Sequence, residues 1–297
     1  MTYSHSNEKI PVAILGATGA VGQKAIALLE GHPIFRISQL AASNAKAGQR
    51  YADVVNWREA SPLSAAVANL PLVALHDVTC PVALSALPAS VANNAELALA
   101  DRGIHIFSNA AAHRMDPTVP ILIPEVNMEH LALLKEQQRP GKITTNSNCA
   151  VAVIAPVIAA ALSVACIRHI GVVTLQAVSG AGAHAVDTFD TFHNIIPHIS
   201  GEADKIVSET RKICDNTQLP MTVQVHRIPL LHGHMAAIQI QYATSTSAAE
   251  VAHAIAEQAA RYPATYVVYD DQAMPQPAHT LNDRDMCIHI GGIRQGG

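Results

Sequence analysis

Residues 10–32 read IPVAILGATGAVGQKAIALLEGH and change character twice within one short span. The apolar run 10–15 has the composition of a buried strand, and the residues after the loop have helical spacing. Between them, Gly16, Gly19 and Gly22 form a G-x-x-G-x-x-G loop. Glycine permits a tight turn and lets backbone N–H groups approach a pyrophosphate at the positive end of a helix. The stretch predicts a dinucleotide-binding unit, although a purely structural tight turn would also use these glycines.

The region about 20 residues beyond the loop bears on which dinucleotide would bind, because an NAD site usually places an acidic residue there. Here it reads LAASNAKAGQRY and contains no Asp or Glu. Its hydroxyl, amide and cationic groups suit a 2′-phosphate, and they are supplied by Ser43, Asn44, Lys46 and Arg50. These residues favour NADP over NAD, with a solvated basic loop as the alternative.

Strands and helices continue to alternate through the first half of the chain. Strands are expected at 37–43 and 104–110, a strand–turn–strand segment at 70–88, and a helix at 92–103. This alternation predicts a parallel, doubly wound sheet of Rossmann type in residues 1–148.

The pattern changes after residue 148. A helix is expected to run to about residue 163 and another over 247–263, with strands rich in β-branched residues between and after them. Because the later strands alternate polar and apolar residues, residues 149–297 are predicted to form an α+β domain with a mainly antiparallel sheet.

The bulk composition limits the class of protein. The 297 residues are 49% hydrophobic and 14% charged, enough for two domains with their own cores, and the net charge is −4. No basic excess indicates nucleic acid, and neither a signal peptide nor a membrane span is expected. The five cysteines form no CxxC pair, and LHGH at 231–234 lacks a surrounding ligand cluster, so we expect no disulfide framework, no metal site and a cytoplasmic location.

One thiol stands where polar sequence gives way to apolar sequence. Residues 144–148 read TTNSN, and Cys149 then opens the apolar helix. A helix N-terminus with a nearby imidazole lowers a thiol pKa, and the first backbone N–H groups of the helix can hold an oxyanion. A free cysteine also packs well as a small buried hydrophobe. Taken alone, Cys149 is therefore either a nucleophile or a packing residue.

Longer segments of the chain, in order, resemble the aspartate-semialdehyde dehydrogenase family in its archaeal/fungal-type branch. They are GATGAVGQ, LSALP, SNAAAHRMDPTVPILIPEVNMEHL, NSNCA, LQAVSGAG, NIIPHISGEADKIVSETRKI and RIPLLHGH. The resemblance implies an NADP-binding domain over residues 1–148 and a catalytic and dimerisation domain over 149–297. It also implies reduction of L-aspartyl 4-phosphate by NADPH to aspartate 4-semialdehyde and phosphate, through a cysteine thioester, in a homodimer or dimer of dimers.

The same resemblance implies a role for individual residues. Cys149 matches the nucleophile, Gln176 the glutamine that orients the acyl intermediate, and His234 the general acid/base. The substrate-binding positions are Arg227 for the carboxylate, Glu202 for the amino group, and Lys205 and Arg114 for the phosphate. The cofactor-binding positions are Gly16, Thr18, Gly19, Ala20, Val21, Gly22, Ser43, Arg50, Ser85 and Gly180. His232 is interpreted as structural or surface, and the four other cysteines as packing residues.

The sequence departs from the family pattern at three places. Ala183-His184-Ala185 replaces Tyr-Pro-Gly, Met235 stands where Thr is usual, and a strand and helix expected after the GGIRQ segment are absent. Two alternative functions follow. A related acyl-CoA reductase would keep Cys149 and His234 without needing the phosphate ligands, and a non-catalytic nucleotide-binding paralogue would fit the shorter terminus.

Overall fold

The computed structural model describes residues 8–181, 193–270, 274–280 and 286–296. The chain forms two compact units: Met1–Ile121 with His130–Asn146, and Leu122–Glu129 with Ser147–Gly297. The sequence places one boundary between residues 148 and 149. The structure differs by assigning residues 122–129 to the second unit, because α5 (Pro124–Asn127) packs on α6 (Cys149–Leu162).

The first unit is built on a six-stranded sheet in the order β3-β2-β1-β4-β5-β6, with every pairing parallel. Its strands are β1 (Ile10–Leu15), β2 (Phe35–Ala42), β3 (Leu72–Ala74), β4 (Val82–Ser85), β5 (His105–Ser108) and β6 (Ile143–Thr145). Its helices are α1 (Ala20–Leu29), η1 (Asn44–Lys46), α2 (Tyr51–Val54), α3 (Ala65–Ala68), η2 (Leu75–Asp77) and α4 (Ala89–Asp101), and η3 (Met128–Lys135) crosses the boundary between the units. This order is that of a Rossmann fold, and the Rossmann-type prediction is confirmed.

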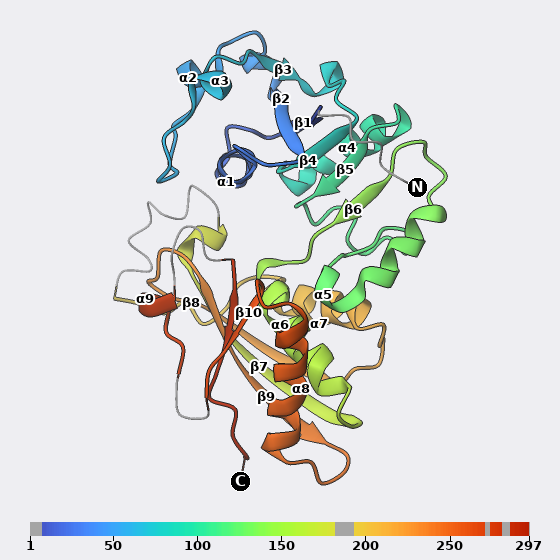
Figure 1. Cartoon of the computed structure of the whole chain (residues 1–297), viewed down its shortest axis with the longest axis vertical. Helices are drawn as coiled ribbons and strands as arrows, with labels where there is room; N and C mark the ends of the chain where they lie inside the picture. The colour runs from blue at the N-terminus through green and yellow to red at the C-terminus, as the bar shows by residue number, and fades with distance from the viewer. Residues whose placement is uncertain (1–7, 182–192, 271–273, 281–285, 297) are drawn as a thin grey trace. The chain divides into compact units, whose positions relative to one another are not determined.

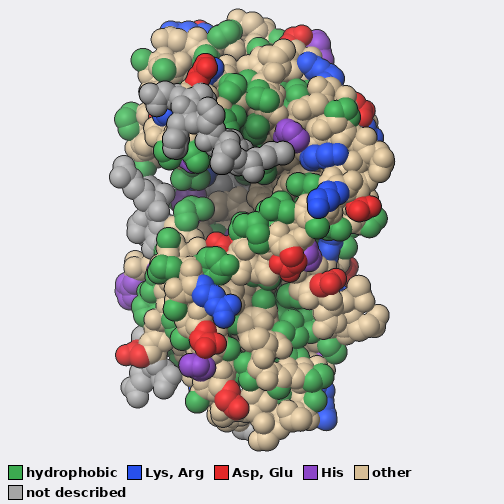
Figure 2. Space-filling view, turned by 45° about the vertical axis from the view of Figure 1, so that its right-hand side comes forward, with side chains coloured by type: hydrophobic (Ala, Val, Ile, Leu, Met, Phe, Trp, Pro, Cys, Tyr) green, Lys and Arg blue, Asp and Glu red, His purple; other side chains and the backbone are tan. Residues whose placement is uncertain are grey.

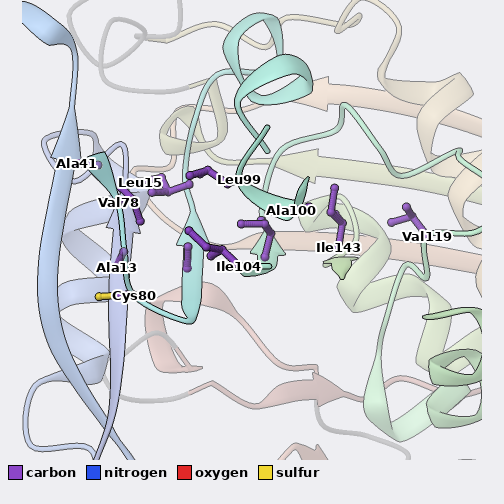
Figure 3. Close-up of a cluster of buried hydrophobic side chains, with 12 residues drawn as sticks. Ala13, Leu15, Ala41, Val78, Cys80, Leu99, Ala100, Ile104, Val119 and Ile143 are labelled. Carbon is purple, nitrogen blue, oxygen red and sulfur yellow. The ribbon is translucent and has the colours of Figure 1, made fainter. Parts of the chain in front are cut away.

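Strand β1 is buried on both faces, as its continuous apolar run predicts. Val12 and Ile14 belong to a core cluster that includes Ile26 of α1. Leu15 belongs to a second cluster, drawn in Figure 3, with Leu99 of α4. Helices therefore cover both faces of the sheet. The strand order places β1 next to the middle of the sheet.

The second unit contains a three-stranded sheet in the order β8-β7-β9 and a parallel pair of strands (Figure 1). Its strands are β7 (Ile167–Gln176), β8 (Met221–Arg227), β9 (His234–Tyr242), β10 (Tyr266–Val268) and β11 (Ile288–Ile290), and its remaining helices are η4 (Val178–Ala181), α7 (Glu202–Ile213), α8 (Ala248–Arg261) and α9 (Pro277–Thr280). Helix α6 packs on β9, α7 packs on β8, and α8 packs on α6.

The α/β class is confirmed, but the second sheet is mixed rather than mainly antiparallel. Strand β9 runs antiparallel to β7, whereas β8 runs parallel to it. The physical reason is that α7 lies between β7 and β8 in the chain. It brings the chain back to the end of the sheet where β7 begins, so β8 runs parallel to β7.

None of the helices in the described ranges is both long enough and apolar enough to cross a membrane. On the face of the molecule shown in Figure 2, acidic and basic side chains are interspersed.

Candidate active site

Three of the predicted site residues lie in one row across the second sheet. Gln176, the last residue of β7, pairs with Arg227 on β8 and with His234 on β9. Residues directly opposite one another on neighbouring strands project to the same face of a sheet. The register therefore brings a glutamine, an arginine and a histidine together at one end of the sheet.

Gly180 lies against this row. A Cβ atom at Gly180 would be 3.0 Å from Arg227 Nη1 and 3.1 Å from His234 Cε1. Arg227 Nη1 also donates a 2.7 Å hydrogen bond to the Ala177 carbonyl, which fixes the buried guanidinium. Gly180, predicted as a cofactor contact, therefore lies where a side chain would press against both Arg227 and His234.

The ring of His234 has two neighbours at its Nδ1 atom. Nδ1 lies 3.0 Å from the Gly233 carbonyl oxygen and 3.1 Å from the Ala177 N–H nitrogen. The same N–H lies 3.3 Å from the Gly233 oxygen. If Nδ1 carries the proton, both donors converge on the Gly233 carbonyl and Nε2 keeps its lone pair. That tautomer presents a base at Nε2.

Burial also lowers the pKa of His234 below its ordinary value of 6.5. The hydrogen bond to the Gly233 carbonyl opposes this shift, the positive Arg227 adds to it, and the negative Glu202 opposes it. Because the lowering effects prevail, the imidazole is neutral near pH 7 and is ready to accept a proton.

Cys149 is the first residue of α6, and its side chain is exposed. It is one of five cysteines that form no disulfide. Exposure at a helix N-terminus disfavours the packing interpretation and favours a reactive thiol, because the helix dipole stabilises a thiolate there.

Asn148 caps this helix and changes one expectation about it. Its Oδ1 accepts the Ala150 N–H at 2.8 Å, and its carbonyl accepts the Ala152 N–H at 2.9 Å. The sequence predicted that the first N–H groups of the helix would hold an oxyanion. The cap uses the Ala150 N–H, so this one N–H group of the first turn is not available to an oxyanion.

Helix α7 connects the cap to the cross-strand row. Glu202, its first residue, is buried, and its Oε1 accepts from Asn148 Nδ2 at 2.8 Å and from Gln176 Nε2 at 3.4 Å. Lys205, one turn later, is half exposed, and its Nζ lies 3.8 Å from Glu202 Oε2. Glu202 therefore lies inside the protein, whereas Lys205 lies on the solvated side of the helix.

The glycine loop of the first unit has the geometry of a dinucleotide cradle. Gly16 has φ +77°, and a Cβ there would lie 2.7 Å from the Ala86 carbonyl oxygen after β4. A Cβ at Gly22 would lie 2.4 Å from the Gly16 carbonyl oxygen. Helix α1 begins after Gly19 without a side-chain cap, so its first N–H groups face the loop. The loop sits between β1 and β4, where the strand order reverses and dinucleotides bind in this fold.

The end of β2 carries the predicted 2′-phosphate ligands. Ser43 is exposed, and Lys46 Nζ lies 3.5 Å from Thr18 Oγ1 of the glycine loop. The Arg50 guanidinium instead donates to the Asp53 carboxylate, at 2.6 Å from Nη2 to Oδ1. This ion pair raises the pKa of Arg50 and lowers that of Asp53. Lys46 therefore contacts the glycine loop, whereas the Arg50 guanidinium is engaged by Asp53.

Two other predicted residues lie in the first unit. Ser85, at the end of β4, is buried, and its Oγ has no hydrogen-bond partner among the described residues. Arg114 is also buried, and its Nη2 donates to the Asn109 carbonyl at 2.8 Å. These residues belong to the first unit, whereas Cys149 and the cross-strand row belong to the second.

Comparison with known proteins finds one family model for each half of the chain. Residues 11–134 match the family model described as semialdehyde dehydrogenase, NAD binding domain, and residues 154–297 match semialdehyde dehydrogenase, dimerisation domain. An aspartate-semialdehyde dehydrogenase from Cryptococcus neoformans is 35% identical over 97% of this chain and 88% of that protein. The chain belongs to the aspartate-semialdehyde dehydrogenase family.

Aspartate-semialdehyde dehydrogenases from fungi and archaea are 33–35% identical to this chain, which confirms the predicted branch. The enzyme of that name from Archaeoglobus fulgidus is 33% identical over 96% of this chain and 89% of its own. The crystal structure of aspartate semialdehyde dehydrogenase with NADP from Candida albicans has a TM-score of 0.86 and 29% identity, and the match covers 98% of this chain and 90% of that one.

The departures from the family pattern fall outside the row. Met235 follows His234 on β9 and pairs with Leu175, so strand alternation directs it to the opposite face, where it is 41% exposed. Residues 183–185 lie outside the described residues. His232 is exposed, as expected.

The packing interpretation of the remaining cysteines holds only in part. Cys80 is buried. Burial also raises the pKa of the Cys214 thiol to about 12, which fits a packing residue. Cys287 is half-buried, but Cys166 is exposed in the turn after α6, so that cysteine does not pack in a core.

Two buried residues of the second unit were not predicted from the sequence. Asn148 lies in the polar run before Cys149, where an Asn ahead of an apolar helix is a recognised capping signal. Glu209 was not singled out, yet its buried carboxylate accepts the Asn148 N–H at 2.6 Å. Its spacing from Glu202 puts both on one face of α7, which the pattern of buried residues could have indicated.

Proposed function

We propose that this chain catalyses the NADPH-dependent reductive dephosphorylation of L-aspartyl 4-phosphate to L-aspartate 4-semialdehyde. One observation carries the proposal. An exposed thiol, Cys149, opens a helix whose cap is tied through Glu202 to Gln176, in register with Arg227 and His234. A nucleophile, a base and a carboxylate-binding cation are thereby held on one unit.

In the proposed reaction the thiolate of Cys149 attacks the acyl carbon of the substrate. A C–S bond forms, the C–O bond to the phosphoryl group breaks, and inorganic phosphate leaves with that electron pair. The product is a thioester on Cys149, a carbonyl that Gln176 is positioned to orient through its side-chain amide.

Reduction of the thioester needs a hydride, which NADPH supplies when bound. In this proposal His234 Nε2 takes up the proton of the Cys149 thiol as the thiolate forms, and gives that proton to the oxygen that becomes the thiohemiacetal hydroxyl. It takes that proton back as the C–S bond breaks and the aldehyde leaves. The lowered pKa of His234 keeps its base form populated for this return.

Substrate recognition follows from charge. The planar guanidinium of Arg227 suits a carboxylate, since its fork can bond both oxygens. The buried carboxylate of Glu202 suits the substrate ammonium group. Lys205, together with Arg114 from the first unit, would supply the cations that a leaving phosphate requires.

The first unit would hold NADP. Its uncapped α1 and close-packed glycines fit the pyrophosphate, and the end of β2 carries Ser43, Asn44 and Lys46 instead of an acid. Since the second half matches a dimerisation domain, we expect a homodimer. The five cysteines form no disulfide, which agrees with the proposed cytoplasmic location.

The test is a phosphate-dependent assay of NADP reduction with aspartate semialdehyde. We expect activity in the wild type, none in Cys149→Ala, and full activity in Cys166→Ala, a matched control that removes the other exposed cysteine. Activity that survives Cys149→Ala contradicts the thioester mechanism. Activity absent from all three proteins contradicts the proposed function and supports a non-catalytic nucleotide-binding protein.

A further inference from the structure

The residue before the nucleophile is held by two carboxylates from one helix. Asn148 is 7% exposed and makes three hydrogen bonds of 2.6–2.8 Å: its N–H to Glu209 Oε2, its Nδ2 to Glu202 Oε1, and its Oδ1 from the Ala150 N–H. Backbone, side-chain donor and side-chain acceptor are all engaged. The residue that leads into Cys149 therefore has little freedom to rotate.

The partner of the backbone N–H lies far away in the sequence. Glu209 is 61 residues from Asn148 and is 2% exposed. Burying a carboxylate is costly unless strong hydrogen bonds compensate it, and a neutral oxygen would satisfy an N–H at lower cost. The 2.6 Å bond from the Asn148 N–H is such a compensating hydrogen bond, and it holds the backbone of Asn148 in place.

Glu202 and Glu209 act on Asn148 from the same face of α7. They are seven residues apart, or about two helical turns, and lie with Ile206 and Ile213 on the buried side of the helix. Glu202 reaches the side chain of Asn148 and Gln176, and Glu209 reaches its backbone. Through these hydrogen bonds, helix α7 connects the start of α6 to the cross-strand row.

We propose that Glu209 is a positioning residue for Cys149, acting through the Asn148 N–H to fix the start of α6 against the Gln176 row. This inference rests on the proposed function, because it assigns Glu209 a part in the nucleophilic step. A thiol that must approach an acyl carbon at reacting distance loses rate steeply when its backbone shifts, by as much as about 100-fold for a displacement of 1 Å. Glu209 itself touches neither substrate nor thiol in this account.

The decisive experiment compares four variants of the full chain. Glu209→Met removes the acceptor, Glu209→Asp keeps the charge but withdraws it by one methylene, and Glu209→Gln keeps an oxygen in reach of the N–H. Asp204→Asn, on the exposed side of the same helix, is the matched control. Each protein is measured for kcat, KM for aspartate semialdehyde, thermal midpoint, and the rate of Cys149 alkylation by iodoacetamide.

We expect kcat to fall by about 10-fold or more in Glu209→Met and Glu209→Asp, with KM nearly unchanged. In both variants the alkylation rate should change several-fold, whereas Glu209→Gln and Asp204→Asn should stay within about 3-fold of the wild type. If Glu209→Met does not fold, Glu209→Asp decides alone.

The inference would be overturned if Glu209→Asp had the kcat and the Cys149 alkylation rate of the wild type. It would also be overturned if the kcat of Glu209→Gln were as low as that of Glu209→Asp. Failure of the proposed function would look different. The wild type would then lack phosphate-dependent activity, and the alkylation rates would still report on the link between Glu209 and Cys149.

Discussion

Gln176 and His234 lie directly opposite each other at the end of the antiparallel pair β7 and β9. Arg227 occupies the matching position on the other side of β7, in a parallel pairing. The row exists because the sheet is mixed: β8 and β9 run in opposite directions, so the end of one and the start of the other meet beside Gln176. Residues 228–233 connect Arg227, the last residue of β8, to His234, the first residue of β9.

Gly180 sets a steric limit on this row. In Gly180→Ala, the new methyl group would lie 3.0–3.1 Å from the Arg227 and His234 side chains, so both must shift. We expect kcat/KM to fall by about 10-fold or more, since small displacements at a reacting centre are costly. The free energy of unfolding, measured in parallel, should change little. Wild-type kcat/KM would show that the close packing at Gly180 does not matter.

The acid–base behaviour of His234 can be measured directly. Because burial disfavours the charged imidazolium, its pKa should lie below 6.5, and the neutral base form should be present above that pKa. Arg227→Gln removes a positive neighbour and should raise the pKa. An NMR titration of the histidine ring signals, with His234→Asn to assign the resonance, gives both values. A His234 pKa of 6.5 or higher in the wild type contradicts the burial argument.

Lys46 should contribute more than Arg50 to recognition of the 2′-phosphate, because the Arg50 guanidinium is paired with Asp53. We expect Lys46→Met to weaken NADP binding by about tenfold, the usual size of one charge-assisted contact, and to leave NAD binding nearly unchanged. Binding is followed by fluorescence titration, with exposed Lys135→Met as the matched control. If Lys46→Met weakened the binding of NAD and NADP equally, Lys46 would not be a ligand of the 2′-phosphate.

Ser85 has a buried hydroxyl without a partner among the described residues. An unmade buried hydrogen bond is unfavourable, so Ser85→Ala should leave the free energy of unfolding unchanged or raise it by about 1 kcal/mol. If Ser85 serves the cofactor instead, the same variant should bind NADP several-fold more weakly. Urea unfolding with and without NADP separates the two effects. A variant that is less stable without NADP would show that the hydroxyl has a structural partner.

Much of the fold could be predicted from local sequence. The apolar run 10–15 is β1, the helix expected over 247–263 is α8, and the strand–turn–strand segment at 70–88 contains β3 and β4. These elements depend on hydrophobic spacing and glycine positions, which are local properties.

The direction of strand pairing could not be predicted in the same way. Alternating residues look alike in β8 and β9, and only the crossover through α7 makes β8 parallel to β7. The contact between Asn148 and Glu209 spans 61 residues and depends on how α7 packs. The pairing of Arg50 with Asp53, by contrast, follows from a spacing of three residues on a short helix and could have been anticipated.

The central claim is that Cys149 carries the acyl group, and a single-turnover experiment without phosphate tests it most directly. Enzyme, NADP and aspartate semialdehyde are mixed, the NADPH formed is followed by absorbance, and the quenched protein is digested for mass spectrometry. We predict a burst of about one NADPH per active site, since the thioester cannot turn over without its acceptor. The peptide that contains Cys149 should carry one aspartyl group. Steady NADPH formation without phosphate, or an aspartyl group on any other residue, would contradict this account.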